Sequence, residues 1–159
     1  MKNLKPFYSF IAVVTVAAFF TIVSCSKDST SATPSQTDVR DLAVGNYTGN
    51  ANLTDSVGNK QFDTTTTIVI AKGPGKTLTI TEEGNTITTS DIVSSGNNIS
   101  GSIPSQSVKF NGQDATIIGK GPNNDQLGYQ DAQKVFTYTF EITDGQLKGY
   151  TYMVYANKK

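Results

Sequence analysis

The sequence is informative first through the residue types that it lacks. Among its 159 residues there is no histidine and no tryptophan, and there is one cysteine, Cys25, and one arginine, Arg40. These absences exclude His general bases, Cys–His nucleophiles, zinc sites built from Cys and His, haem ligation through either residue and any intramolecular disulfide. The fold must therefore depend on a packed core, to which seven Tyr and eight Phe contribute bulk.

Charge of either sign is also scarce and evenly balanced. The chain has 13 basic and 13 acidic residues, and its lysines are scattered singly. A nucleic-acid-binding domain needs a basic stripe rich in Arg and Lys, so nucleic acid is not an expected partner.

Motifs of catalysis are missing as well. The chain contains no Gly-rich phosphate loop, no Gly-x-Ser-x-Gly elbow and no Asp-rich calcium loop. Glu82 and Glu83 are adjacent beside a glycine turn, where neighbouring side chains point to opposite faces, and we expect both to be solvated. The sequence thus predicts a protein that is not an enzyme, with no cofactor and no metal.

The N-terminal residues have the pattern of an export signal. Lys2 and Lys5 precede an uncharged apolar run, Phe7–Val23, and polarity returns after Cys25. Basic residues, an apolar run and small residues before a cleavage site are typical of a secretory signal peptide. The run is also near the length of a spanning helix, so an uncleaved signal anchor is the alternative on length alone.

The last four residues of this stretch favour a lipoprotein. Ile22-Val23-Ser24-Cys25 resembles the bacterial lipobox, and this resemblance implies cleavage before Cys25, lipidation of its thiol and acylation of the new N-terminus. Two or more acyl chains give stable membrane attachment. The implied location is the cell outer membrane, with the protein lipid-anchored on the periplasmic face or the cell surface, and Ser26-Lys27-Asp28 is similar to a short version of a surface-export signal.

The composition changes again after Cys25, which divides the chain into three parts. Residues 1–24 are the predicted signal peptide, and residues 25–38 are rich in Ser and Thr with almost nothing apolar. Such a segment cannot bury enough surface to offset the entropy of ordering, so we expect a flexible tether that carries the lipidated cysteine. Residues 39–159 form the predicted folded domain.

This domain is predicted to be all-β. Val39–Val44 is expected to form a short helical turn with Asp38 as its N-cap. Beyond it, short β-branched and aromatic runs alternate with Gly, Asn, Asp and Pro, the pattern of an antiparallel sandwich or barrel. The predicted strands are Gly45–Leu53, Phe62–Ala71, Lys76–Glu82, Asn85–Ser94, Asn97–Ile103, Ser107–Asn111, Asp114–Gly119, Lys134–Thr143 and Gln146–Ala156.

Two segments interrupt the strand pattern. Pro104 is expected to break the run between Ile103 and Val108, because proline lacks the N–H that a sheet ladder needs. Gly121–Ala132 is rich in Asn, Asp, Gly and Gln, and we expect a long loop there, over a barrel mouth or in a hairpin. Loops often carry function, so a contact through this segment is a further hypothesis.

Alternation places several aromatic residues on one face of the sheet. These residues are the core of the domain on one interpretation and the lining of a ligand site on the other. The candidate ligand-binding residues are Phe62, Phe136, Tyr138, Phe140, Tyr150 and Tyr152.

Short motifs give the folded part a family resemblance. The opening Gly45-Asn46-Tyr47-Thr48-Gly49, the stretch Ile99–Gln106 and a closing pair of aromatic strands resemble the lipocalin-like (calycin-like) lipoproteins of Bacteroidetes-type bacteria. The resemblance implies a single antiparallel up-and-down β-barrel of about eight strands. The chain lacks the Gly-x-Trp of true lipocalins.

Three functions follow as expectations. The favoured one is a membrane-anchored envelope lipoprotein that acts as a non-catalytic binding module for a small hydrophobic molecule, a glycan or a protein partner. The second is a structural or interaction lipoprotein with a filled barrel and no ligand. The third is an inhibitor of envelope enzymes, which requires an ordered and projecting Gly121–Ala132.

Overall fold

The computed structural model describes residues 38–110, 112–121 and 125–159. They fall in one compact unit, Thr37–Lys159. The predicted signal peptide, the lipidation site Cys25 and the tether up to residue 37 lie outside the described residues. Within the described ranges, no helix has the length and apolar character needed to cross a membrane.

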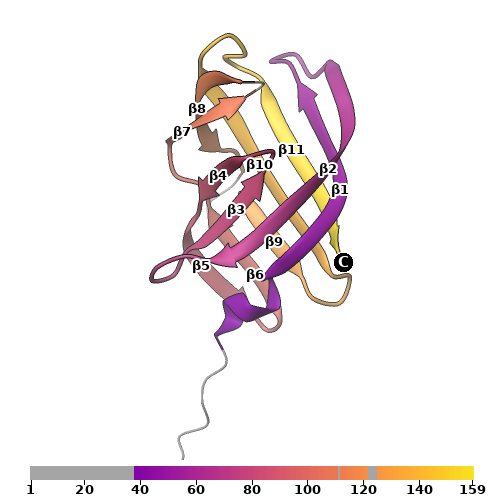
Figure 1. Cartoon of the computed structure of the whole chain (residues 1–159), viewed down its shortest axis with the longest axis vertical. Helices are drawn as coiled ribbons and strands as arrows, with labels where there is room; N and C mark the ends of the chain where they lie inside the picture. Colours follow the sequence, from indigo (N-terminus) through magenta and orange to yellow (C-terminus); the bar gives the residue numbers. More distant parts are fainter. Residues whose placement is uncertain (1–37, 111, 122–124) are drawn as a thin grey trace, which may run out of the picture. The chain divides into compact units, whose positions relative to one another are not determined.

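The unit is all-β, as the sequence predicts, and consists of one short 3-10 helix followed by strands (Figure 1). All ladders between the named strands are antiparallel. In chain order the elements are η1 (Val39–Leu42), β1 (Gly45–Thr54), β2 (Lys60–Lys72), β3 (Leu78–Glu82), β4 (Asn85–Thr88), β5 (Ser90–Ser95), β6 (Asn98–Ser102), β7 (Gln106–Phe110), β8 (Gln113–Gly119), β9 (Leu127–Gln130), β10 (Val135–Asp144) and β11 (Thr151–Lys158).

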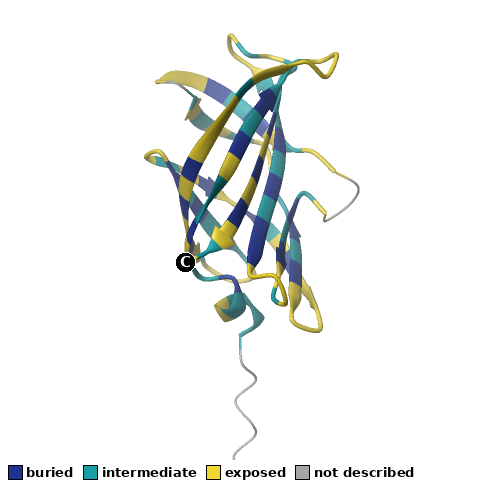
Figure 2. Cartoon of the chain, turned by 90° about the vertical axis from the view of Figure 1, so that its right-hand side faces the viewer, coloured by how far each residue is buried: buried dark blue, intermediate teal, exposed yellow. Residues whose placement is uncertain are grey.

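These eleven strands form an antiparallel sheet that curls into a nearly closed barrel (Figures 1 and 2). The paired order is β4-β3-β2-β1-β11-β10-β9-β6-β5, with β8 on β10 and β7 on β8. Three pairs of consecutive segments, β4 with β5, β6 with β7 and β8 with β9, each share one position around the barrel. Eleven segments therefore occupy eight positions, and the predicted up-and-down barrel of about eight strands is confirmed.

The interruptions within these positions have local causes. Pro104 lies between β6 and β7, as predicted. Between β4 and β5, the backbone N–H and the hydroxyl of Thr89 both bond to the Leu78 carbonyl, at 2.9 and 3.0 Å. The ladder from β5 to β6 then shifts register between Ser90 and Val93, where Asp91 adopts a positive φ of 53°. The chain bends at this point, and its pairing partner changes from β3, which pairs with β4, to β6, which pairs with β5.

One seam of the barrel is held by side chains instead of a ladder. β5 pairs with β6, but β4 and β7 have no ladder between them. The side-chain amide of Gln106 bonds to both the N–H and the carbonyl of Thr88, each at 2.8 Å, and the Asn85 side chain accepts from the Lys109 N–H at 2.9 Å. The barrel is thus least continuous between β4 and β7.

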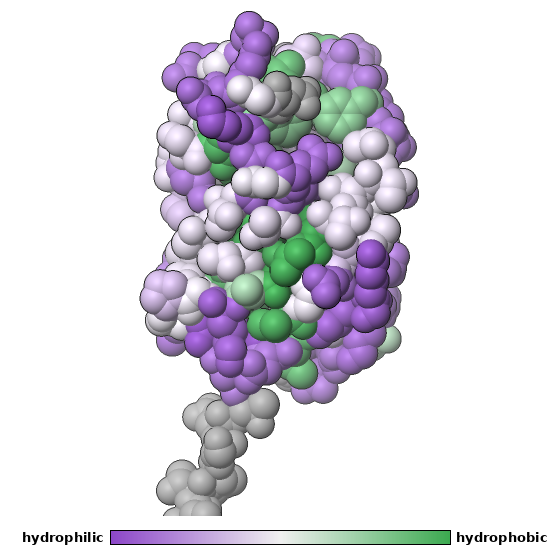
Figure 3. Space-filling model, viewed as in Figure 1, coloured by the Kyte–Doolittle hydropathy of each residue, from purple (hydrophilic) through white to green (hydrophobic). Residues whose placement is uncertain are grey.

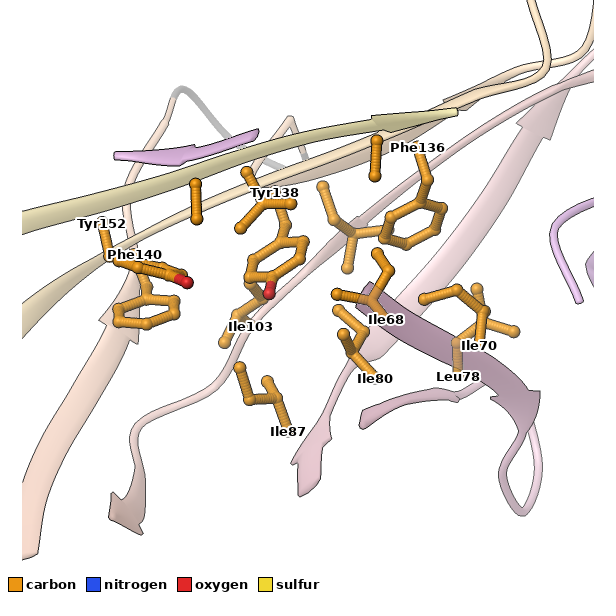
Figure 4. Close-up of a cluster of buried hydrophobic side chains, with 14 of the residues drawn as sticks. Ile68, Ile70, Leu78, Ile80, Ile87, Ile103, Phe136, Tyr138, Phe140 and Tyr152 are labelled. Carbon is orange, nitrogen blue, oxygen red and sulfur yellow. The ribbon is translucent and has the colours of Figure 1, made fainter. Parts of the chain in front are cut away.

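The inner face carries the core in the alternating pattern that the sequence predicts. Side chains two residues apart on β2, β3, β10 and β11 are buried, and Figure 4 shows several of them converging from opposite walls. The largest fully buried side chains are Tyr47, Ile68, Ile70, Leu78, Ile80, Ile103, Ile117, Leu127, Tyr129, Phe136, Tyr138 and Ile142.

Two sequence expectations are wrong in this region. The segment Gly121–Ala132 is not a continuous loop, because Leu127–Gln130 form β9 between β6 and β10 and bury Leu127 and Tyr129. The sequence pattern did not predict this strand because it has only four residues, two of them inward, within a polar segment. The last strand begins at Thr151 and not at Gln146, since Gly145 and Gly149, with φ of 96° and 86°, form a wider connection.

The short helix η1 closes one end of the barrel by contact with several elements. Asp38 caps it as predicted, accepting from the Arg40 N–H at 3.0 Å. The Arg40 guanidinium bonds to the carbonyls of Gly73 and Thr77, and the Tyr47 hydroxyl donates to the Ala43 carbonyl at 2.6 Å. Side chains therefore fill the barrel at this end.

Candidate functional site

A cavity of about 270 Å³ lies at the end of the barrel that carries the β3–β4 and β7–β8 connections. It adjoins the seam between β4 and β7, and we call it the mouth cavity. Its lining residues come from β2, β3, β4, β7, β10 and β11 and from the turn after β3: Phe62, Thr64, Glu82, Glu83, Asn85, Ile87, Val108, Lys109, Phe110, Phe140 and Tyr152. The cavity is thus built from strands far apart in the sequence.

Glu82 is the one buried charged side chain in the part of the chain that the structure describes, and only 7% of its surface is exposed. It is the last residue of β3 and follows Leu78 and Ile80 on the inner face. Glu83 and Gly84 then turn the chain with φ of 47° and 82°, both positive as a tight hairpin turn requires. The expectation that Glu82 is solvated is therefore wrong, whereas Glu83 is exposed.

Three hydroxyl groups donate to the Glu82 carboxylate. Thr66 and Tyr152 bond to its Oε1 at 2.6 and 2.8 Å, and Tyr138 bonds to its Oε2. These donors come from β2, β11 and β10 and join one carboxylate to three walls of the barrel. Such a network satisfies a buried acceptor by hydrogen bonds but supplies no opposite charge.

Four aromatic rings form the apolar side of the mouth cavity. The Tyr152 ring centroid lies 5.0 Å from that of Phe140, 5.3 Å from that of Phe110 and 6.3 Å from that of Phe62. Phe62 and Phe110 stack at 6.4 Å across the space between β2 and β7. On the side of the molecule seen in Figure 3, residues of hydrophilic or intermediate hydropathy cover most of the surface, and hydrophobic residues show in patches between them.

The structure separates the six predicted ligand-binding residues into three groups. Phe62, Phe140 and Tyr152 line the mouth cavity. Tyr138 does not line the cavity but bonds to Glu82, which does. Phe136 packs deeper in the core beside Tyr47, at 5.7 Å between ring centroids. Figure 4 shows Phe136 and Tyr152 at opposite ends of the buried cluster. Tyr150 precedes β11 and is partly buried against the core, outside the lining of this cavity.

Among the lining residues that were not predicted, Glu82 and Phe110 contribute most to the character of the cavity. Glu82 was detectable, because the alternation Leu78, Ile80, Glu82 continues the inward face by one more step. Phe110 is the last residue of β7 and precedes an Asn-Gly dipeptide in the sequence. It lies beside Tyr152 because β7 and β11 both line the mouth cavity. No local pattern in the sequence places those two rings together.

Burial dominates the electrostatics of the tyrosines around Glu82. It raises the pKa of Tyr138 well above the usual value, and the negative charge of Glu82 raises it further. The pKa of Tyr152 is raised by the same two causes, burial first. Burial also raises the pKa of Tyr47 at the other end of the barrel. These hydroxyls consequently remain protonated donors when an exposed tyrosine has ionised.

A spectroscopic titration tests this arrangement. A raised pKa means that the folded state favours the protonated phenol, so this contribution to stability is complete below the ordinary pKa of about 10 and is lost as the pH rises beyond it. We expect Tyr47, Tyr138 and Tyr152 to stay un-ionised above pH 10 until the protein unfolds, as monitored by tyrosinate absorbance alongside circular dichroism. Ionisation of all seven tyrosines of the chain near pH 10, with the fold retained, would contradict it.

The mouth cavity combines a buried carboxylate with hydroxyl groups and aromatic rings. Glu82 has no second buried carboxylate opposite it among the residues described, as a glycosidase pair would need. Nor do those residues include a group of three or more Asp, Glu, His or Cys able to hold a metal ion. One buried acceptor, three hydroxyl donors and four rings provide orientation and apolar contact.

No model of a known protein family matches the chain, and no curated protein matches it in sequence. The resemblance to lipocalin-like lipoproteins thus stays a prediction from short motifs, whereas the barrel itself follows from the order of the strands.

Proposed function

We propose that this protein is a lipid-anchored envelope lipoprotein whose barrel binds a small molecule in the mouth cavity without catalysing a reaction. One observation carries the binding part of the proposal. A largely filled barrel keeps a cavity of about 270 Å³ at one end, lined by aromatic rings and by a buried, hydrogen-bonded carboxylate. Apolar walls with a few fixed polar groups are characteristic of ligand sites.

The size of the cavity supports a small molecule over a long lipid or a glycan chain. Ligand pockets commonly measure about 300–1,000 Å³, and an apolar cavity of about 150 Å³ in another protein holds benzene. A cavity of about 270 Å³ has room for one ring with a short substituent. The side chains of Tyr47, Tyr129 and Phe136 fill the other end of the barrel.

The alternative of an inhibitor that projects Gly121–Ala132 gains no support. Leu127 and Tyr129 of this segment are buried in β9, so this half is part of the barrel wall. The alternative of a filled structural barrel without a ligand predicts that no molecule occupies the mouth cavity, and the binding experiment below tests that directly.

Native mass spectrometry with a matched pair of variants tests the binding proposal. Thr64 lines the mouth cavity, and its neighbour Thr65 is exposed on the opposite face of β2. We expect the wild-type chain, incubated with a small-molecule extract of cells, to retain an added mass. Thr64→Phe should lose it by filling the cavity, and Thr65→Phe should keep it.

Either of two results would reject small-molecule binding at this site. One is the absence of any non-covalently bound mass on the wild type under gentle conditions, which favours the structural alternative. The other is an equal added mass in Thr64→Phe, which would mean that the ligand binds outside the mouth cavity. Circular dichroism of both variants checks that each is folded.

The anchor has an independent test at Cys25. Because the thiol is the acylation site in the lipobox prediction, Cys25→Ser should move the protein from the membrane fraction to the soluble fraction. Metabolic labelling with a fatty acid, read by gel fluorescence, should mark the wild type and not the variant. Persistent membrane association of the variant with an unprocessed N-terminus would favour the signal anchor.

A further inference from the structure

The Glu82 carboxylate is buried without a cation beside it. The acidic side chains that do form ion pairs in the described residues are all more exposed than Glu82, with exposed fractions of 19–88%. No Lys or Arg of the described chain comes within ion-pair distance of Glu82. Burial of a charge is costly unless an opposite charge accompanies it.

The three hydroxyl groups around Glu82 leave part of its capacity unused. A carboxylate offers about four acceptor positions, and Thr66, Tyr138 and Tyr152 occupy three of them. Two of the three bonds end on Oε1 and one on Oε2, so Oε2 has the free capacity. Since all three donors are neutral, they orient the carboxylate without cancelling its charge.

The walls beside this carboxylate are also suited to positive charge. The faces of aromatic rings attract a cation within about 6 Å of their centroids. Phe62, Phe110 and Tyr152 surround the cavity that Glu82 lines, with centroids 5.3–6.4 Å apart. The same fold uses this contact elsewhere: the Lys158 ammonium lies 5.7 Å from the Tyr129 ring and 6.0 Å from the Tyr47 ring.

The lining of the cavity as a whole carries more negative than positive charge. Glu83 lines it beside Glu82, and Lys109 is the single basic residue among the lining residues. Lys109 forms an ion pair with Asp114 at 3.1 Å, and its side chain is 67% exposed. Its charge is therefore turned to solvent and balanced by a carboxylate outside the cavity.

From this combination we propose that the mouth cavity selects a small organic cation, an ammonium group on a short chain attached to one apolar or aromatic ring. The inference rests on the proposed binding function and adds the chemical class of the ligand. The ammonium group donates to the Glu82 carboxylate, and the ring packs among Phe62, Phe110 and Tyr152. A metal ion fits less well, because one carboxylate and three hydroxyl groups already bonded to it do not form a coordination shell.

Three probes that share a 2-phenylethyl group and differ in charge test the proposal on the full chain, purified in detergent. They are 2-phenylethylammonium, the neutral 2-phenylethanol and the anionic 3-phenylpropionate. By isothermal titration calorimetry we expect the cation to bind about tenfold more tightly than the alcohol, or better, because only the ammonium group brings a charge opposite to that of the carboxylate. The anion should bind most weakly.

Two isosteric variants assign the selectivity to Glu82. Glu82→Gln should remove the preference for the cation and bring the affinities for cation and alcohol to within about threefold of each other, since the amide carries no charge. Glu83→Gln, one residue further and exposed, should keep most of the preference. The ratio of two affinities on one sample does not depend on the folded fraction, so a partly folded Glu82→Gln sample still gives a valid answer.

The outcomes separate this inference from the binding function. Equal affinity for cation and alcohol, tighter binding of the anion, or a preference that survives in Glu82→Gln would overturn the assignment to a cation while leaving a small-molecule site in place. Failure of all three probes to bind would also reject the cation. The binding function of the mouth cavity is tested separately by native mass spectrometry, and it fails if the wild-type chain binds no small molecule there or if Thr64→Phe binds as much as the wild type.

Discussion

Replacing Gly49 by alanine is expected to lower the free energy of unfolding by about 3 kcal/mol or more, beyond the usual range for one added methyl group. A Cβ at Gly49 would lie 2.0 Å from the Tyr155 carbonyl oxygen and 2.4 Å from the Ala156 Cα. These are backbone atoms of β11, the partner of β1 in the ladder. Neither can move away by a change of rotamer, so the two strands must separate.

Gly128→Ala is the matched control for this substitution. Gly128 also lies within a strand, β9, but an added Cβ there meets its nearest neighbours at 3.6 Å, an ordinary contact. We expect a change within about 1 kcal/mol, with a gain in stability if the loss of chain entropy in the unfolded state dominates. Urea denaturation of both variants gives the comparison, and equal stability of Gly49→Ala and Gly128→Ala would contradict the clash.

The Gly49 result bears on the motif that opens the folded domain. In Gly45-Asn46-Tyr47-Thr48-Gly49, Gly45 has a φ of 149° and Tyr47 is fully buried with its hydroxyl on the Ala43 carbonyl. Gly49 lets β1 approach β11 closely. The spacing thus has a structural cause: a turn out of η1, an inward aromatic anchor and a close contact of two strands.

The second large effect is expected at Phe136. This side chain is fully buried and packs against Tyr47 at 5.7 Å and Tyr138 at 6.4 Å between ring centroids. Truncation of a buried Phe to Ala leaves a cavity and typically costs about 3–5 kcal/mol. Because domains of this size are stable by only about 5–15 kcal/mol, Phe136→Ala should remove a large share of the total stability.

Urea denaturation measures this loss, and Tyr155→Ala is its control. Tyr155 is an aromatic residue of β11 on the outer face, 51% exposed, so its truncation should cost less than about 1 kcal/mol. A loss for Phe136→Ala no larger than that for Tyr155→Ala would mean that this end of the barrel is not tightly packed. Phe136 would then again be a candidate for contact with a ligand.

Much of the barrel was predictable because strand periodicity is a local property. Alternation of Ile68 and Ile70, of Leu78 and Ile80, and of Phe136, Tyr138 and Phe140 already separates an inner from an outer face. Pro104 marked a break, and Asp38 marked the cap of η1. Each of these signals depends on one residue and its immediate neighbours in the chain.

The candidate site was less predictable, because its parts come together only in the barrel. Glu82 beside Glu83 has the sequence of an exposed turn, and the one signal against this is that Glu82 continues the inward alternation of Leu78 and Ile80 by one step. Its donors Thr66, Tyr138 and Tyr152 are 16, 56 and 70 residues away. No pattern in the sequence distinguishes Tyr152, in the mouth cavity, from Phe136, in the core, since both continue an alternating aromatic face.

The absence of histidine and of all but one cysteine, the strand periodicity and the turn residues are properties of the sequence by itself, and they determined the excluded chemistries and the all-β class. The tertiary structure alone decided where the barrel is filled and where it is hollow. The physical reason is that a cavity depends on the volumes that side chains from several strands occupy together. At one end Tyr47, Tyr129 and Phe136 fill that volume, and at the other Glu82 and its aromatic neighbours leave part of it open.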